Sequence, residues 1–380
     1  TQDRVMRREV LINEGALFNR TRLTLSQRKI NQLGYVEAKE DPVIEPVEGE
    51  NRVRVRFPVE EKGRNEIQVG GGYSGLDGAF FTGVYSTRNF LGRGQVVSLA
   101  LQIGGRSSRY QLSFTEPWFM NRPITLGFSV FRRDVDYGAT LQSTSRGGGI
   151  ILGKRLTTFS NVQLAYGYES VTSNSLGFAV GADGELQQLS SEASNKISSL
   201  TPTFLFDKIN NPYRPSSGQR FSASVQVAGG PLGGDTAFIK PIVNYTTYTR
   251  FVGRSYIAIH AEGGMVREWG DGTTANSGTI NGIPRYQRFW LGGDTQGPRV
   301  FESRTISPLR YVVIDENTGQ IVEVLGDPTG RPVGDFLSSG NIPVVIEVGG
   351  DRYFLLQTEV VYPFNEQADL ALFVDVGDSL

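Results

Sequence analysis

The sequence predicts a mainly β protein: a transmembrane antiparallel β-barrel preceded by a small α+β module. Three observations indicate this fold class. Apolar residues alternate with polar or small ones from about residue 64 onward, the alternating segments are long, and the connections between them are alternately short and long. Strands that cross a bilayer need about 9–11 residues. Outer-membrane barrels carry short turns at the periplasmic end and long loops at the outer end.

Composition excludes several kinds of site. The 380 residues include no cysteine and one histidine, His260, and the formal net charge is −1. Disulfides, thiolate metal sites and multi-histidine metal sites are therefore excluded, and no basic face calls for nucleic acid. His260 lies in the alternating segment SYIAIHAEGG, which favours a barrel-wall residue over a Ser-His-Asp site. We predict no enzyme activity, no catalytic residue, no metal, no cofactor and no nucleic-acid partner.

Residues 1–62 predict the small α+β module. Two segments, 3–15 and 21–35, space their apolar residues at helical intervals. Asp3 is placed to cap the first helix, and Gly34 is placed to end the second. Two strands that form a hairpin are expected over 35–48 and 51–61, because valines alternate with charged residues there. No strand precedes the helices, so the sheet of this module is expected to be incomplete.

Residues 63–380 predict the barrel. Thirteen alternating segments of about 9 to 16 residues are expected as strands, and the connection over about 269–351 is expected as a long loop. Such lengths exceed those usual in a sandwich. The expected strands are 65–74, 78–88, 94–105, 109–118, 123–135, 144–155, 159–171, 197–208, 218–229, 236–251, 254–268, 352–363 and 368–376.

The connections and faces of these strands support a membrane location. Turns such as NFLGRG and FVGRS are short, whereas the other set includes the segments around 172–196 and 269–351. In RYQLSFTEPWF, Tyr110, Leu112 and Phe114 share one face, opposite polar residues. One apolar and one polar face suit a barrel with lipid outside and a polar lumen. A soluble barrel or sandwich is the alternative, but thirteen strands would need an unusually wide core.

Several motifs together resemble the BamA family, the outer-membrane β-barrel assembly factors with POTRA modules. VMRREVLINEGALFN followed by LGYVEAKED is similar to the last POTRA module before the barrel. RNFLGRGQ resembles the first periplasmic turn, and TEPWF the end of the fourth strand. PRVFESRTISP resembles the sixth-loop signature and FVDVG the thirteenth-strand signature. The resemblance implies a sixteen-stranded barrel, of which the thirteen strands here are a part, so the chain is expected to be a fragment.

The sixth-loop motif is Pro298, Arg299, Val300 and Phe301. The family usually has Val-Arg-Gly followed by Phe or Tyr, so Pro298 and Val300 are departures. The resemblance implies that this loop folds into the lumen and that Arg299 meets Glu359 and Asp375 on the barrel wall. Strand alternation independently places both carboxylates on the face away from lipid. Phe301 is expected to pack beside Arg299. The thirteenth-strand motif is Phe373, Asp375 and Gly377.

The resemblance implies an insertase that folds and inserts β-barrel clients through a lateral seam. The first strand is expected at this seam, through Glu66, Gln68, Gly70, Gly71 and Gly72, since glycines weaken a strand. Implied partners are unfolded outer-membrane proteins, accessory assembly lipoproteins, periplasmic chaperones and the lipid bilayer. The implied location is the bacterial outer membrane, with the N-terminal module in the periplasm. A polypeptide transporter of the two-partner secretion type remains the alternative.

Overall fold

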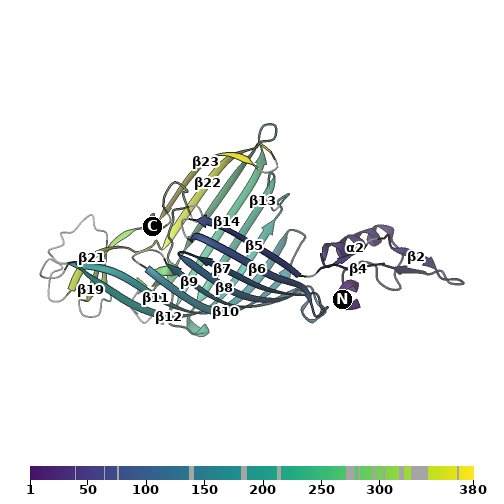
Figure 1. Ribbon diagram of the computed structural model, residues 1–380, viewed down its shortest axis with the longest axis horizontal. Coiled ribbons are helices and arrows are strands. Elements are labelled where there is room, and N and C mark those ends of the chain that lie inside the picture. The colour runs from purple at the N-terminus through teal and green to yellow at the C-terminus, as the bar shows by residue number, and fades with distance from the viewer. Residues whose placement is uncertain are drawn as a thin grey trace.

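The computed structural model describes most of the chain and shows a curved antiparallel sheet with a small module at one end (Figure 1). Within the described residues, no helix is long and apolar enough to span a membrane. The residues described are 1–38, 40–63, 65–74, 77–136, 141–180, 186–211, 215–270, 279–280, 283–293, 297–302, 304–315, 321–326, 341–365 and 368–380.

The N-terminal module contains the two expected helices, α1 (Asp3–Arg7) and α2 (Arg20–Gln32). Gly34 follows α2 with φ +78°, so the expected end of this helix is confirmed. The expected cap on α1 is wrong, because Gln2 is the N-cap residue and Asp3 is already helical. Asn19 caps α2 by accepting a hydrogen bond from the Arg22 amide at 3.1 Å.

Each of the two strands expected in this module is interrupted. The hairpin consists of β1 (Val36–Glu37), β2 (Val43–Pro46), β3 (Val53–Arg56) and β4 (Glu60–Glu61), with β2 paired to β3 and β1 to β4. Pro42 and Pro58 lie at the two interruptions. Proline has no amide hydrogen, so it cannot donate to a strand ladder. The module core is formed by Val5, Ile30, Tyr35 and Val36.

The large sheet confirms the predicted barrel strands. Its order is β23-β22-β15-β14-β13-β12-β11-β10-β9-β8-β7-β6-β5, with a short extra strand, β16 (Arg267–Glu268), paired to β14. The strands are β5 (Asn65–Ser74), β6 (Gly78–Phe90), β7 (Gln95–Gly104), β8 (Ser107–Glu116), β9 (Ile124–Asp136), β10 (Leu141–Arg155), β11 (Ser160–Val180), β12 (Leu186–Asp207), β13 (Gly218–Ala228), β14 (Phe238–Arg250), β15 (Tyr256–Met265), β22 (Arg352–Pro363) and β23 (Asp369–Ser379).

One expectation about the connections is wrong. The segment around 172–196 is largely strand, because β11 and β12 remain paired from Ser160 and Phe206 out to Val180 and Leu186. Polar residues with no apolar alternation fill much of this stretch, so hydrophobic periodicity gave no signal for it. Hairpins that project beyond a membrane need no apolar face. Short 3-10 helices, η1 (Phe119–Asn121) and η2 (Gly230–Leu232), occur in two turns.

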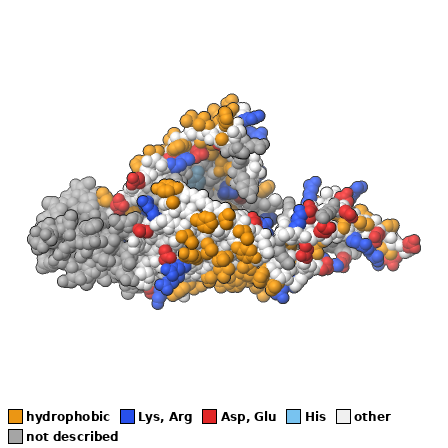
Figure 2. All heavy atoms as spheres, in the orientation of Figure 1, with side chains coloured by type: hydrophobic (Ala, Val, Ile, Leu, Met, Phe, Trp, Pro, Cys, Tyr) orange, Lys and Arg blue, Asp and Glu red, His pale blue; other side chains and the backbone are white. Residues whose placement is uncertain are grey.

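The two faces of the sheet differ as the sequence predicts. Leu112, Val130, Leu372 and Val374 lie on the outer face and are 48%, 58%, 74% and 66% exposed. Figure 2 shows apolar side chains gathered over the strands and continuing toward the N-terminal module. Such a face suits contact with lipid.

The long connection between β15 and β22 contains structure of its own. It includes β17 (Thr279–Ile280), β18 (Ile283–Pro284) and η3 (Arg285–Gln287). A three-stranded sheet follows, in the order β20-β19-β21, from β19 (Leu309–Asp315), β20 (Ile321–Gly326) and β21 (Asn341–Glu347). This connection is called the long loop below.

The N-terminal module contacts the end of the sheet where the short turns lie. The Gln2 amide donates to Gly92 O at 2.8 Å, and Asn89 Nδ2 donates to Thr1 Oγ1 at 2.7 Å. Gly92 belongs to the turn between β6 and β7, and Asn89 lies at the end of β6 next to that turn. The module and the short turns therefore mark the same end of the barrel.

Candidate functional site

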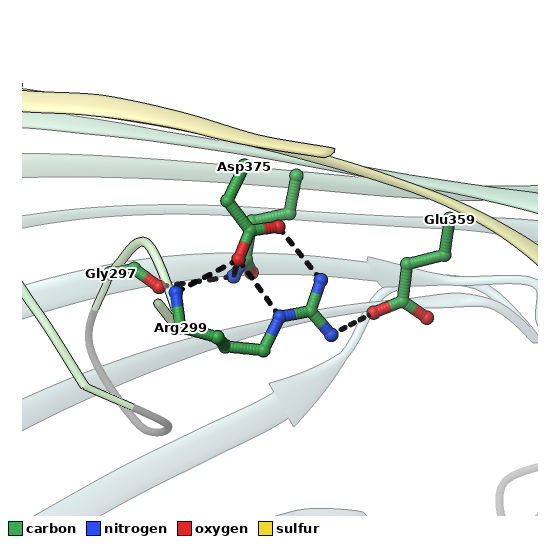
Figure 3. Close-up of polar contacts among 5 residues, drawn as sticks. Gly297, Arg299, Glu359 and Asp375 are labelled. Atoms are coloured by element: carbon green, nitrogen blue, oxygen red, sulfur yellow. Dashed lines mark hydrogen bonds and ion pairs between the residues drawn. The ribbon is translucent and has the colours of Figure 1, made fainter. Parts of the chain in front are cut away.

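Arg299 attaches the long loop to the barrel wall (Figure 3). Arg299 donates to Asp375 three times: from its amide to Oδ2 at 3.0 Å, from Nε to Oδ2 at 2.8 Å and from Nη2 to Oδ1 at 2.7 Å. Nη1 donates to Glu359 Oε1. The planar guanidinium thus spans two carboxylates on adjacent strands, an arrangement that lysine's single ammonium cannot reproduce.

Strand register explains why the partners converge. Gln357 pairs with Asp375, and Glu359 pairs with Phe373, across β22 and β23. Residues two apart on a strand share a face, so all four side chains project to the same side. Gln357 Nε2 donates to Gly297 O at 3.3 Å and to Asp375 Oδ2 at 3.4 Å. The wall therefore also binds the loop backbone next to the arginine.

An aromatic ring completes this group. The Arg299 guanidinium carbon lies 4.0 Å from the ring centroid of Phe373. A cation above an aromatic face is stabilised by the ring quadrupole. We call Arg299, Asp375, Glu359, Gln357 and Phe373 the polar clamp.

Burial makes the polar clamp more than a surface ion pair. The Asp375 side chain is 2% exposed, Arg299 27% and Glu359 29%. Hydrogen bonds to Asp375 and Glu359 raise the pKa of Arg299, against the opposing effect of burial. A buried carboxylate needs its charge partner, so Asp375 depends on Arg299 more than the partly exposed Glu359 does.

The other motif residues occupy different positions. Pro298 is buried, but Val300 is 82% exposed and Phe301 53% exposed. The expectation that Phe301 packs beside Arg299 is wrong, because Phe373 takes that place. The Phe301 amide donates to Pro298 O at 3.2 Å, closing a tight turn. Val300 is not at positive φ; among the described residues of this segment, positive φ occurs at Gly292 (112°), Gly293 (90°) and Arg304 (66°).

Gly377, the last residue of the thirteenth-strand motif, makes room for the loop. A Cβ at this position would lie 3.0 Å from Phe354 O, 3.1 Å from Leu355 Cδ1 and 3.4 Å from Leu291 Cδ1. Leu291 belongs to the long loop. Phe373, Asp375 and Gly377 therefore present an aromatic ring, a carboxylate and a gap along one face of β23.

A second attachment, which sequence reasoning missed, lies a few residues before the polar clamp. We call Phe289, Trp290 and Leu291 with their partners the apolar anchor. Phe289 exchanges backbone hydrogen bonds with Gly350 at 2.9 and 2.8 Å, and its carbonyl also accepts from Ser379 Oγ at 2.8 Å. Its ring centroid lies 4.3 Å from that of Tyr353.

The apolar anchor enters the main core cluster of the barrel. Phe289 is 8% and Leu291 3% exposed, and both pack with residues from β12, β13, β14 and β22, namely Ile197, Ala228, Phe238 and Tyr353. Lys240 Nζ donates to Gln287 O at 2.8 Å and lies 4.9 Å from the Phe289 ring centroid. The sequence signal that could have indicated this attachment is the run of apolar residues Phe289, Trp290 and Leu291 within a long loop.

Two arginines, Arg285 and Arg304, lie next to the apolar anchor. Arg285 is 8% exposed; burial lowers its pKa to about 10, and nearby Arg304 contributes. Both guanidinium groups lie close to one ring: Arg304 is 4.5 Å and Arg285 5.7 Å from the Trp290 ring centroid. The Arg285 carbonyl accepts from Trp290 Nε1 at 3.0 Å. Stacking on one aromatic ring therefore holds two arginines side by side.

The expected seam strand, β5, forms one end of the described sheet. Its residues pair only with β6 among the described strands. Gln68 Nε2 donates to Glu66 Oε1 at 2.6 Å, and Arg88 binds Glu66 Oε2 at 3.3 Å. Gly71 and Gly72 face Phe80, where an added Cβ would lie 3.0 Å from its carbonyl oxygen and 3.1 Å from its ring, respectively. These glycines allow close approach of β6.

No group of three or more His, Cys, Asp or Glu side chains suited to a metal occurs in the part of the chain that the structure describes. His260 lies on β15, bonded to Thr246 Oγ1 at 2.9 Å and 3.3 Å from Glu262 Oε2. Glu262 in turn accepts a hydrogen bond from the Tyr353 hydroxyl. The single histidine is thus part of a polar network on the barrel wall.

Family comparisons agree with this architecture. The family model of the Omp85 superfamily domain matches residues 89–380, and a POTRA model, described as a surface antigen variable number repeat, matches residues 1–62. The chain belongs to the Omp85 superfamily.

Individual relatives point to one branch of that superfamily. The outer membrane protein assembly factor BamA of Nitratidesulfovibrio vulgaris is 25% identical over 380 residues, covering 99% of this chain and 42% of the relative. BamA of Neorickettsia risticii is 26% identical over 244 residues, covering 63% of this chain and 32% of the relative. The chain thus spans less than half the length of these curated relatives.

Solved structures share the fold. The crystal structure of BamA from Haemophilus ducreyi lacking POTRA domains 1–3 matches with a TM-score of 0.76 at 19% identity, covering 100% of this chain and 69% of that one. CdiB from Acinetobacter baumannii matches with a TM-score of 0.54 at 11% identity, covering 99% of this chain and 61% of that one. The family models and the BamA relatives together confirm the resemblance to the BamA family.

Proposed function

We propose that the protein containing this chain is an outer-membrane protein assembly factor, an insertase that folds and inserts β-barrel clients. The barrel lies in the outer membrane, and residues 1–62 act as the periplasmic module while 63–380 form the barrel. The observation that carries the proposal is the polar clamp within a barrel of this family. It holds a long loop against β22 and β23 at the end of the described sheet opposite β5.

The mechanism we infer is strand addition. A client strand pairs with the backbone of β5, through the segment that includes Glu66, Gln68 and Gly70 to Gly72. Unpaired strand edges are templates for a new strand. Glycines have no side chain to pack across the strand pair, so the hydrogen bonds between β5 and β6 can open there at a low cost in free energy. No step of this mechanism needs a catalytic residue or a cofactor, and the partners are unfolded barrel clients, accessory lipoproteins and periplasmic chaperones.

The role of the polar clamp in this mechanism is to fix the last described strands. Arg299 bridges β22 and β23 through Glu359 and Asp375. With those strands held by the long loop, opening of the sheet is confined to the other side of the seam. The motif residues Pro298, Val300 and Phe301 shape the turn that presents Arg299, and Gly377 leaves room for Leu291.

Reconstitution tests the proposal. The full-length protein is placed in lipid vesicles and given a small, urea-unfolded outer-membrane barrel as client, with photo-crosslinkers at positions 66–73. We expect faster client folding than in empty vesicles and crosslinks from the β5 positions to the client. An Arg299→Gln variant should lose most of the acceleration, whereas the exposed loop variant Glu302→Gln should retain it.

The secretion alternative gives a different result in the same vesicles. A transporter would move a polypeptide across the membrane and leave the client folding rate at that of empty vesicles. That result, with no crosslink from β5 while crosslinkers elsewhere in the barrel work, would contradict the insertase proposal. The curated relatives named as assembly factors support the insertase over the transporter.

A further inference from the structure

A groove of about 380 Å³ lies where the N-terminal module meets the barrel. Its walls come from α1, from the turn after β6 and from the segment that joins β8 to β9. The groove is therefore at the short-turn end of the barrel. Residues of the RNFLGRGQ and TEPWF motifs line it, but the proposed insertase mechanism does not use it.

Strand register places the groove on the outer, lipid-facing side of the barrel. Leu112 pairs with Val130, Phe114 with Phe128 and Glu116 with Leu126 across β8 and β9. Residues that alternate along one strand share a face with their direct partners. Phe114, Leu126 and Glu116 line the groove, so the exposed apolar column above them continues directly into it.

Three arginines line the same groove: Arg4 and Arg8 from the module and Arg93 from the turn after β6. Arg4 and Arg93 are exposed, and neither side chain forms an ion pair or hydrogen bond with any other described residue. The Arg8 side chain is 15% exposed and its guanidinium lies 5.4 Å from the Trp118 ring centroid. Its buried Nε has no hydrogen-bond partner among the described residues, and the Glu9 carboxylate is 3.9 Å away.

Among the described residues that line the groove, Glu116 is the one acid, and both of its oxygens already accept hydrogen bonds. Glu116 Oε2 accepts from Gln95 Nε2 at 2.8 Å, and Glu116 Oε1 accepts from the Trp118 amide at 3.0 Å. Both of its oxygens thus have donors from the barrel itself. The lining carries three arginines and one carboxylate, and Glu9 offsets part of the charge of Arg8 from 3.9 Å. The groove therefore keeps a net positive charge where it meets the apolar column.

We propose that this groove binds the phosphate headgroup of an anionic phospholipid in the periplasmic leaflet. Arginine forks suit phosphate oxygens, and aromatic residues such as Trp118 favour the headgroup level of a bilayer. The apolar column of β8 and β9 receives the acyl chains. A soluble phosphate would use the arginines but not the column.

A lipid bound here would join the two parts of the molecule. Arg4 and Arg8 belong to the module, whereas Arg93, Trp118 and Phe114 belong to the barrel. A headgroup between them neutralises their charges and gives the module a fixed position at the membrane surface. The anionic lipid therefore acts as a structural ligand of the junction, whatever the activity of the barrel.

Native mass spectrometry of the full-length protein tests the site. The protein is reconstituted in vesicles of phosphatidylcholine mixed with phosphatidylglycerol, extracted, and scored for retained phosphatidylglycerol. The groove variant carries Arg4→Gln, Arg8→Gln and Arg93→Gln. The matched control carries Arg20→Gln, Arg22→Gln and Arg28→Gln, which removes the same charge from exposed positions of α2. A milder variant with Arg4→Gln and Arg93→Gln alone leaves the packed Arg8 in place.

We expect about tenfold weaker phosphatidylglycerol retention in the triple groove variant, a smaller loss in the double variant, and wild-type retention in the control. Equal retention in all variants, or equal losses in groove variant and control, would overturn the proposal. A final competition experiment with inorganic phosphate distinguishes a lipid headgroup from a free anion. Displacement of phosphatidylglycerol by phosphate at comparable concentration would assign the groove to a free anion instead of a lipid. Failure of client folding would not affect any of these readouts.

Discussion

The polar clamp and the apolar anchor fasten the same long loop, but they rest on different parts of the barrel. In the polar clamp, the loop contacts side chains of β22 and β23, namely Asp375, Glu359, Gln357 and Phe373. The apolar anchor packs into a cluster that reaches across β12, β13, β14 and β22. Loss of the anchor should therefore weaken the barrel broadly, whereas loss of the clamp should release the last described strands.

The chemistry of the two attachments also differs. The apolar anchor is held by burial of Phe289 and Leu291, which is non-directional and tolerant of small shifts. The polar clamp depends on a charge pair in which Asp375 is almost fully buried. Buried pairs contribute little net stability but cost much when one partner is removed. We conclude that the anchor supplies stability and the clamp fixes the position of the loop.

The largest expected effect comes from the apolar anchor. Phe289→Ala should lower the free energy of unfolding by about 4 kcal/mol, because it leaves a cavity in the core cluster. Urea unfolding of the full-length protein in lipid vesicles measures this change. Phe301→Ala is the matched control in the same loop, and its exposed ring should cost less than about 0.5 kcal/mol. Equal losses of unfolding free energy in both variants would contradict the distinction between the buried anchor and the exposed surface of the loop.

Removal of the buried charge should come next. Asp375→Asn should cost about 3 kcal/mol, because the Arg299 guanidinium loses its main charge partner while two guanidinium hydrogen bonds and one amide hydrogen bond to this residue weaken. Urea unfolding again reports the loss, and client folding in vesicles should fall with it. Glu302→Gln removes a charge from the exposed part of the same loop and should leave both quantities unchanged. A matching loss in Glu302→Gln would mean that loop charge, and not the clamp, matters.

A smaller effect is expected at the second carboxylate. Glu359→Gln should cost about 1 kcal/mol, because Glu359 accepts one hydrogen bond from Arg299 and is partly exposed to solvent. The comparison with Asp375→Asn in the same unfolding experiment ranks the two acids. A larger loss at Glu359 than at Asp375 would show that burial does not set the strength of the clamp.

The smallest effect concerns the ring under the arginine. Phe373→Leu keeps the apolar volume but removes the aromatic face, so a loss of about 0.5–1 kcal/mol is expected. Differential scanning of thermal unfolding, compared with Phe364→Leu at an exposed turn, is sensitive enough to detect this shift. No difference between these two variants would remove the cation–π contact from the account of the clamp.

The polar clamp was open to prediction, whereas the apolar anchor was not. Charged residues on the lipid face of a barrel strand are rare, so strand alternation alone placed Glu359 and Asp375 on the lumen side, and motif resemblance supplied Arg299 as their partner. Phe289, Trp290 and Leu291 form an apolar run in a loop, and no periodicity indicates which strands such a run meets. Its partners, such as Tyr353 and Ser379, lie about 60 to 90 positions away in the sequence.

Local expectations failed where a competing residue was better placed. Phe301 is the aromatic residue of the sixth-loop motif. Strand register, however, places Phe373 opposite Glu359, so the ring of Phe373 lies against the Arg299 guanidinium. The segment around 172–196 lacked the alternation of a membrane strand, yet it continues β11 and β12, because a hairpin in water needs backbone pairing and no apolar face. The thirteen barrel strands, by contrast, followed from alternation and turn spacing alone.

A double-mutant cycle tests the central claim that Arg299 holds the loop through Asp375. Arg299→Gln, Asp375→Asn and the combined variant are compared by urea unfolding in vesicles and by client folding. We expect each single variant to lose most of the unfolding free energy and of the client folding rate that the pair supplies. The double variant should lose little more than either single variant, which corresponds to a coupling energy of about 2 kcal/mol. Additive losses, with coupling below about 0.5 kcal/mol, would contradict the account, because they would show that the two residues act independently.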